Sequence, residues 1–219
     1  HAIEARLYAE DPERNFLPSP GTVHIWEPAT IGKARFDSGI ESGSEIGVEF
    51  DPMIAKVIVH APTRREAASR LASALEQSRL QGLRTNRDFL VETLRTPEFL
   101  AGDTTTDFIE RVNPGRSREL TTLELDQAAL AVVVESRAKR RATANVLGDI
   151  PGGWRNSHMP RESTGFSHKE EEFQVQYNIQ RDGKLSINIL DRHYLVSIYA
   201  AGDGQVDLEI NRIRMSFQI

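Results

Sequence analysis

The sequence contains no cysteine, which excludes a disulfide framework and a thiolate metal site. It has 27 basic and 32 acidic residues, and this net charge of −5 argues against a nucleic-acid partner, because phosphate backbones need concentrated basic surfaces. The longest strongly apolar run, residues 128–134, is far shorter than the roughly 18 residues of a membrane span. Because no secretory-signal pattern occurs, we expect a cytoplasmic protein, or one of the mitochondrial matrix in a eukaryote.

The sequence also lacks the motifs that are typical of phosphate-binding loops and of helical metal sites. No glycine-rich phosphate motif occurs, and the histidines lie at positions 1, 24, 60, 158, 168 and 193. None of them has the i, i+4 partner of a helical metal site, so we predict no metal site in this chain. The 39% hydrophobic and 27% charged residues are typical of globular domains, and 219 residues suffice for one large or two small ones.

Residues 1 to about 60 have the pattern of short strands. Residues 3–8 alternate between apolar and polar side chains, as a half-buried strand does. The two prolines of FLPSPG, at 16–21, interrupt any ladder of hydrogen bonds there. Further short strands are predicted at 22–26, 33–37 and 54–60.

Two helices are predicted after these strands. Thr63 and Glu66 have capping-box spacing, and the apolar positions that follow favour a helix that stops near Gly82. The run TNRD at 85–88 supplies a cap and an early acid for a second helix. Pro97 is suited to the first position of a further short helical turn.

The run NPGRS at 113–117 is the best domain boundary, because it joins turn-forming to polar residues where one pattern ends. We predict one domain at 1–113 and a second at 117–219. The second begins with a long helix from about Thr121 to Thr143. Its middle, 128–134, is apolar on every side, so we expect protein to surround it.

A long irregular loop is predicted at 144–169, because this stretch is rich in glycine, proline, serine and histidine. Alternating segments then predict antiparallel strands joined by hairpin turns, at 173–179, 184–190, 194–199, 206–210 and 213–217. The predicted fold class is α+β: a small mixed α/β domain followed by a long central helix wrapped by an antiparallel, barrel-like sheet.

Three strings near the start of the chain carry a family resemblance: HAIEARLYAEDP at 1–12, FLPSPG at 16–21 and EFDPMIAKVIV at 49–59. In this order and spacing they resemble the C-terminal part of biotin carboxylases, the ATP-dependent half of biotin-dependent acyl-CoA carboxylases. The resemblance implies ATP, magnesium and biotin as cofactors. The family's phosphate loop, its ATP-binding lysines and its metal ligands have no counterpart here, and no AMKM-like biotin-carrier string occurs. We therefore expect a piece of a larger subunit, inactive by itself.

Arg6 is the candidate catalytic residue. The resemblance implies that the arginine of HAIEAR points into the site where bicarbonate is phosphorylated and biotin is carboxylated. Carboxyphosphate and the biotin enolate are anions, and a guanidinium offers them a permanent charge and several donors in a fixed fork. The alternative is a surface arginine that pairs with Glu4 or Asp11.

Two further residues match the family pattern. Asp51, in FDPM, matches an aspartate close to the biotin pocket and to the contact of the biotin carboxylase homodimer. An ordinary Asp-Pro turn is the alternative. Thr106, in TTTDFIE, lies in a segment that resembles the lining of the adenine pocket, and a plain helix N-cap is its alternative.

The second half resembles the BT domain, which links biotin carboxylase to carboxyltransferase in acyl-CoA carboxylase α subunits. The resemblance lies in the long helix, the run PGGWRN at 151–156 and the strands that follow. In that family the helix is the axis of an eight-stranded antiparallel barrel, of which about five strands are readable here. The loop after the helix hooks onto the carboxyltransferase, so Trp154, Arg155 and Asn156 are candidate interface residues. A core plug of the barrel is the alternative role of Trp154.

These features together predict a fragment of the α subunit of a biotin-dependent acyl-CoA carboxylase of the acetyl- or propionyl-CoA type. The implied partners are the carboxyltransferase β subunit, a second biotin carboxylase and the biotin carrier domain, with neither nucleic acid nor membrane. One alternative is a non-catalytic scaffold that holds subunits together. Another is the α chain of a different biotin-dependent carboxylase, for pyruvate or methylcrotonyl-CoA.

Overall fold

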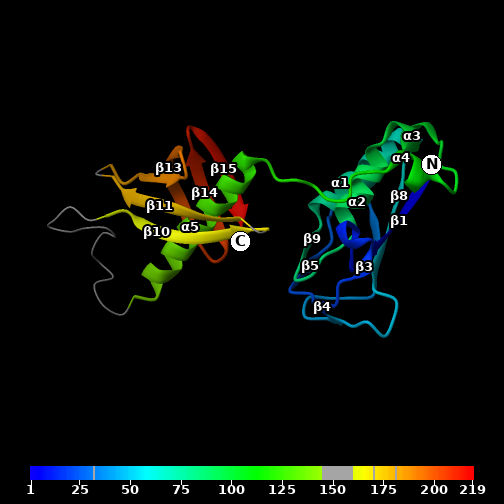
Figure 1. Ribbon diagram of the computed structural model, residues 1–219, viewed down its shortest axis with the longest axis horizontal. Helices are drawn as coiled ribbons and strands as arrows, with labels where there is room; N and C mark the ends of the chain where they lie inside the picture. Colours follow the sequence, from blue (N-terminus) through cyan, green and yellow to red (C-terminus); the bar gives the residue numbers. More distant parts are fainter. Residues whose placement is uncertain (32, 145–159, 170, 181) are drawn as a thin grey trace. The chain divides into compact units, whose positions relative to one another are not determined.

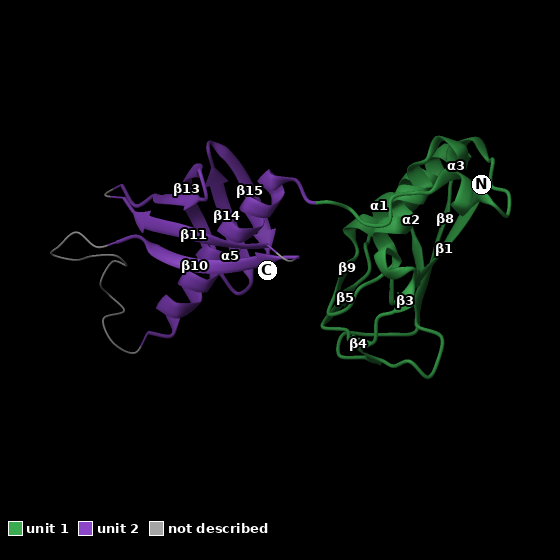
Figure 2. Ribbon diagram, in the orientation of Figure 1, with its two compact units in different colours: residues 1–119 green, residues 120–219 purple. Residues whose placement is uncertain are grey.

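The computed structural model describes residues 1–31, 33–144, 160–169, 171–180 and 182–219. The chain forms two compact units, His1–Glu119 and Leu120–Ile219, which are coloured separately in Figure 2. Helices and antiparallel sheets occur in both units, which confirms the predicted mixture of α and β structure. Among the described residues, no helix is both long enough and apolar enough to span a membrane.

A three-stranded antiparallel sheet is the centre of unit 1, with the order β1 (Ala2–Tyr8), β8 (Met53–His60) and β6 (Arg35–Ser38) (Figure 1). The predicted strands at 3–8, 33–37 and 54–60 are therefore present. Side chains alternate along β1, so that Ala5 and Leu7 are buried while Glu4 and Arg6 are exposed. The sheet thus has a core face and an outer face.

Helix α1 (Arg64–Gln77) packs on the core face, where Leu71 and Leu75 share a cluster with Val57 of β8. The predicted cap is confirmed, because the Thr63 hydroxyl accepts a hydrogen bond from the backbone N–H of Glu66 at 3.2 Å. The predicted stop near Gly82 is wrong. The helix ends at Gln77, and residues 79–81 form β9, which pairs with β5.

The remaining elements of unit 1 are short: β2 (Glu10–Asp11), η1 (Pro12–Arg14), β3 (Leu17–Pro18), β4 (Gly21–Thr22), β5 (Ile25–Glu27), β7 (Glu45–Ile46), β9 (Arg79–Gln81), α2 (Arg87–Arg95), α3 (Pro97–Ala101) and α4 (Phe108–Val112). The single strand predicted at 22–26 is instead divided between β4 and β5. They separate because β4 pairs with β7 whereas β5 pairs with β9, in two different sheets.

Unit 2 consists of helix α5 (Thr122–Ala142) and a six-stranded antiparallel sheet (Figure 1). Its strands, each paired with the next along the chain, are β10 (Glu162–His168), β11 (Glu171–Ile179), β12 (Leu185–Ile189), β13 (Arg192–Gly202), β14 (Gln205–Ile210) and β15 (Ile213–Gln218). A capping box of Thr121 and Glu124 begins the helix. Leu130, Val133 and Val134 lie in one apolar cluster with residues of the sheet.

The apolar middle of the helix predicts that protein encloses it on every side. The structure does not show such an enclosure. Ala128 is exposed and Val132 is only partly buried, because the strands cover one side of α5 and leave these positions facing outward. In the sheet order, β10 and β15 are the two ends. The eight-stranded barrel that the resemblance implies is therefore not confirmed.

β10 is a strand that the sequence patterns miss, since it falls within the loop predicted at 144–169. Its sequence, ESTGFSH, contains a glycine and a single large apolar residue, so alternation is hard to see. The strand forms because it pairs along its whole length with β11, and because Phe166 stacks on Phe173 with ring centroids 5.7 Å apart. Trp154, Arg155 and Asn156 lie outside the described residues.

Candidate functional site

Arg6 projects from the outer face of the unit 1 sheet, with 61% of its side chain exposed. Its Nε lies 3.6 Å from Oε1 of Glu4, and the side chains of Tyr8 and then Glu4 raise the pKa of the guanidinium above its ordinary value. The predicted alternative partner Glu4 is thus present, whereas Asp11 binds Arg84, with Nη1 and Oδ2 3.4 Å apart. The exposed ion pair between Arg6 and Glu4 is weak, so Arg6 remains free to bind another anion more tightly.

Two charged residues lie in the same row of the sheet as Arg6. Lys56 of β8 is its direct register partner, and Asp37 of β6 is opposite Lys56 on the other side. Residues directly opposite in paired strands share one face of the sheet, so these three side chains belong to the outer face. Asp37 is itself bound by Arg35, with Nη2 and Oδ2 3.0 Å apart. The sequence patterns miss this charged row, because register between distant strands is needed to see it.

Asn86 braces the backbone of β1 at the position of Arg6. Its Oδ1 accepts a hydrogen bond from Tyr8 N at 2.9 Å, and its Nδ2 donates to the carbonyl oxygen of Arg6 at 3.2 Å. Its own backbone N–H donates to Tyr8 O, also at 3.2 Å. Asn86 occupies the cap position of α2 but forms no side-chain capping bond. Its side chain instead fixes the strand that presents Arg6.

Asp51 is exposed and lies close to the end of β1. The carbonyl oxygen of the adjacent Pro52 accepts a hydrogen bond from Ala9 N at 2.9 Å, which joins the FDPM segment to the residue after β1. Partial burial, and secondly the charge of Asp51, raise the pKa of the Glu10 carboxyl. The structure therefore brings Asp51 to the strand that carries Arg6, and its role near biotin stays a prediction.

Thr106 is not brought together with Arg6. It is an exposed turn residue before α4, and the N-cap of that helix is Asp107, so the alternative of a cap at Thr106 is wrong. Phe108 of α4 packs edge-on against Phe99, which belongs to the cluster under α1 on the core face of the sheet. The residue two positions after Thr106 is thus connected to the core-face cluster, and a contact of Thr106 with nucleotide stays a prediction.

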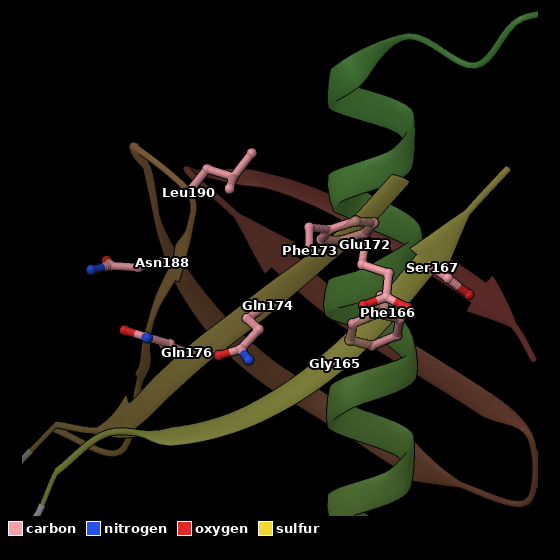
Figure 3. Close-up of a pocket in the computed structure, with 9 residues that line it drawn as sticks. All are labelled: Gly165, Phe166, Ser167, Glu172, Phe173, Gln174, Gln176, Asn188 and Leu190. Carbon is pink, nitrogen blue, oxygen red and sulfur yellow. The ribbon is translucent and has the colours of Figure 1, made fainter. Parts of the chain in front are cut away.

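Unit 2 has a hollow of about 670 Å³ along β10, β11 and β12 (Figure 3). Its lining is mixed, with four uncharged polar residues and one ionisable side chain, Glu172, among the nine residues that line it. It is lined by Gly165, Phe166, Ser167, Glu172, Phe173, Gln174, Gln176, Asn188 and Leu190. One carboxylate beside amides lacks the cations that anionic reactants need, so the outer face around Arg6 is the better candidate site.

The described residues offer no ready set of ligands for magnesium. No group of three or more His, Asp or Glu side chains within the described ranges could hold a metal ion. The outer face of unit 1 does fit an anion, because it presents the guanidinium of Arg6 beside the ammonium of Lys56. Such a face suits a small anion.

Comparison with known proteins agrees with these features. The family described as the biotin carboxylase C-terminal domain matches residues 4–111. The mitochondrial methylcrotonoyl-CoA carboxylase subunit alpha of Mus musculus is 40% identical over 141 residues, which are 63% of this chain and 20% of that protein. The biotin-dependent acyl-coenzyme A carboxylase alpha3 subunit of Mycobacterium leprae is 35% identical over 183 residues, which are 75% of this chain and 31% of that protein.

A solved structure is also similar. It is the biotin carboxylase domain dimer of the Hydrogenobacter thermophilus 2-oxoglutarate carboxylase, in complex with MgADP, ADP and bicarbonate. It is 35% identical, with a TM-score of 0.49, and the match covers 51% of this chain and 25% of that chain. The chain spans 20% of the mouse relative and 31% of the mycobacterial one. It carries a biotin carboxylase C-terminal domain, and it belongs to the family that this domain defines.

Proposed function

We propose that this chain is part of the α subunit of a biotin-dependent acyl-CoA carboxylase, and that unit 1 supplies Arg6 to the site where biotin is carboxylated with ATP and bicarbonate. The observation that carries the proposal is the placement of Arg6. It is an exposed guanidinium on a strand braced by Asn86, in a domain of the biotin carboxylase family.

The chemistry of carboxylation explains why such a residue is needed. Bicarbonate, carboxyphosphate and the enolate form of biotin's ureido group all carry negative charge. Fixed donors that are already oriented stabilise developing charge at little reorganisation cost. Arg6 offers such donors, and the hydrogen bonds of Asn86 with Arg6 O and Tyr8 N hold the backbone that directly follows the Arg6 side chain. ATP and magnesium would be bound mainly by other parts of the subunit, and biotin would be delivered on its carrier domain.

The test is the Arg6→Ala variant of the complete α subunit. Losing one oriented donor to a developing anion typically lowers turnover about 10²- to 10³-fold, so biotin carboxylation should nearly vanish while folding is retained. Arg95→Ala is the matched control, since it removes an exposed arginine that pairs with Glu76 on the helical side of unit 1. Near-normal turnover in folded Arg6→Ala would contradict the proposal.

Unit 2 is proposed to be the BT domain that docks the carboxyltransferase β subunit. Its support is the extent of the similarity. The methylcrotonoyl-CoA carboxylase subunit alpha of Dictyostelium discoideum is 30% identical over 194 residues, or 86% of this chain, whereas unit 1 ends at Glu119. The similarity to α subunits therefore extends into unit 2, which consists of one long helix and an antiparallel meander.

The proposed docking residues are Trp154, Arg155 and Asn156. Trp154→Ala should weaken the assembly of α with β by at least about 2 kcal/mol, the usual threshold of an interface hot spot, and should leave biotin carboxylation intact. Sedimentation of the mixed subunits measures the assembly. Unchanged assembly together with a lower melting temperature of α alone would instead support a core plug.

Three other functions are tested with the same complete subunits. A methylcrotonoyl-CoA carboxylase is favoured by the 40% identity to the mouse subunit, and assays with acetyl-, propionyl- and 3-methylcrotonyl-CoA separate it from the acetyl- or propionyl-CoA type. A pyruvate carboxylase would carboxylate pyruvate in place of an acyl-CoA. A pure scaffold would show no bicarbonate-dependent ATP cleavage at all.

A further inference from the structure

The outer face of the unit 1 sheet places two cations directly opposite each other. Arg6 of β1 and Lys56 of β8 are register partners in an antiparallel pair. Side chains in such pairs begin about 5 Å apart at their Cβ atoms and point to the same face. Both are accessible to solvent, since Arg6 is exposed and Lys56 is only partly buried.

The carboxylates around Lys56 are engaged by other cations. Asp37, its register partner on β6, is bound by Arg35 at 3.0 Å, and Glu4, its diagonal neighbour on β1, lies 3.6 Å from Arg6. Among the described residues, Lys56 has neither a hydrogen bond nor an ion pair from its side chain. Arg6, by contrast, has the weak, exposed ion pair with Glu4 of its own strand.

Like charges directly opposite in paired strands destabilise a sheet, so this arrangement has a cost that an anion would offset. A negative group that binds Arg6 from the solvent side comes within reach of the flexible, four-carbon stem of Lys56. The ammonium of Lys56 then adds a compact second charge, whereas the donors of the Arg6 guanidinium fix the orientation of the anion. The pair together suits a small oxyanion better than either residue alone.

We propose that Lys56 is a second anion-binding residue of the carboxylation site and that it binds, with Arg6, the oxyanion of bicarbonate or of its phosphorylated form. This inference rests on the proposed function of Arg6 and extends it to a residue that the motif comparison does not assign. Lys56 contributes charge at the reactant.

The test uses the complete α subunit with free biotin and measures ATP cleavage as bicarbonate is varied. Lys56→Gln should lower kcat/KM for bicarbonate about tenfold to hundredfold, the usual effect of losing a hydrogen bond to a charged group. Lys56→Arg, which keeps the charge, should retain most of the activity. The melting temperature of Lys56→Gln should equal or exceed that of the parent, because the repulsion with Arg6 is removed. The Arg95→Gln variant controls for the loss of a remote surface cation.

Three outcomes would overturn the inference. Normal kinetics in Lys56→Gln, with Arg6→Ala inactive, would refute the role of Lys56 and leave the proposed function standing. Equal losses in Lys56→Gln and Lys56→Arg, with a lower melting temperature in both, would show that Lys56 acts through packing. Normal kinetics in Arg6→Ala would refute the proposed function and this inference together.

Discussion

Replacement of Asp126 by alanine should destabilise unit 2 strongly, because this carboxylate joins α5 to β13 inside the core. Asp126 is 0% exposed. Its Oδ2 accepts hydrogen bonds from Nε of Arg192 and from the hydroxyl of Tyr194, each at 2.5 Å, and its Oδ1 accepts one from Nη2 of Arg192 at 2.9 Å. Hydrogen bonding to Asp126 raises the pKa of Arg192. Burial, followed by the bond to Asp126, raises that of Tyr194.

The size of the effect follows from what remains after the substitution. Removing one partner of a buried ion pair costs about 3 to 5 kcal/mol, since the other charge is left uncompensated. The Arg192 side chain is 32% exposed, so water would solvate part of its charge, and we expect the lower end, about 3 kcal/mol. In a domain of this size, each kcal/mol moves the melting temperature by about 4 to 8 °C, so the midpoint should fall by about 12 °C or more.

Differential scanning calorimetry of Asp126→Ala measures this shift, and Asp191→Ala is the matched control. Asp191 lies 3.6 Å from Nη1 of the same arginine, but its side chain is 92% exposed. Exposed ion pairs contribute roughly 0 to 1 kcal/mol, so the control should melt within a few degrees of the parent. Equal shifts in the two variants would refute the reasoning that burial of the carboxylate decides its contribution.

Three other substitutions test further features of the two units. Asn86→Ala leaves the N–H of Tyr8 without its acceptor and should cost about 1 to 3 kcal/mol in urea unfolding; an unchanged midpoint would show that water replaces the bond. Val133→Asp puts an unpaired charge at a position that is 1% exposed, and a melting temperature within a degree or two of the parent would contradict the buried position. Glu10 is ionised at a cost at neutral pH, because its folded pKa is raised above the unfolded one. Glu10→Gln should therefore stabilise the protein at pH 7, and this gain should disappear as pH falls below the ordinary glutamate pKa, where both states are protonated; a gain that persists in acid would contradict it.

Structural features that are determined by residues close together in the chain were predictable from the sequence. The predicted cap at Thr63 is confirmed, because its hydroxyl and its backbone partner lie three positions apart in the chain. The helix predicted from about Thr121 to Thr143 is present as α5. The alternating segments after residue 171 form β11 to β15, since alternation alone decides which side chains of a strand face the core. Recognition of the family likewise depended on contiguous strings, which is how Arg6 was found.

Features that join distant parts of the chain were not predictable in this way. Asn86 has the local pattern of a helix cap, yet its side chain binds Tyr8, 78 positions away. Asp126 and Arg192 are 66 positions apart, and nothing in either neighbourhood marks them as partners. Lys56 lies within a string that carries the resemblance, but its place beside Arg6 depends on the register of β1 and β8. Register is decided by the assembled sheet and not by either strand alone.

The use of Asn86 as a brace has a consequence for engineering this domain. Helix α2 begins without a side-chain cap, so a routine search for stabilising changes would select Asn86→Asp, which places a good cap and a negative charge at the helix N-terminus. Aspartate could still accept from Tyr8 N, but it has no N–H to donate to the carbonyl oxygen of Arg6. The substitution would improve the helix and loosen the strand that presents the guanidinium. Selection for heat resistance would then favour aspartate at position 86, whereas selection for turnover would favour asparagine.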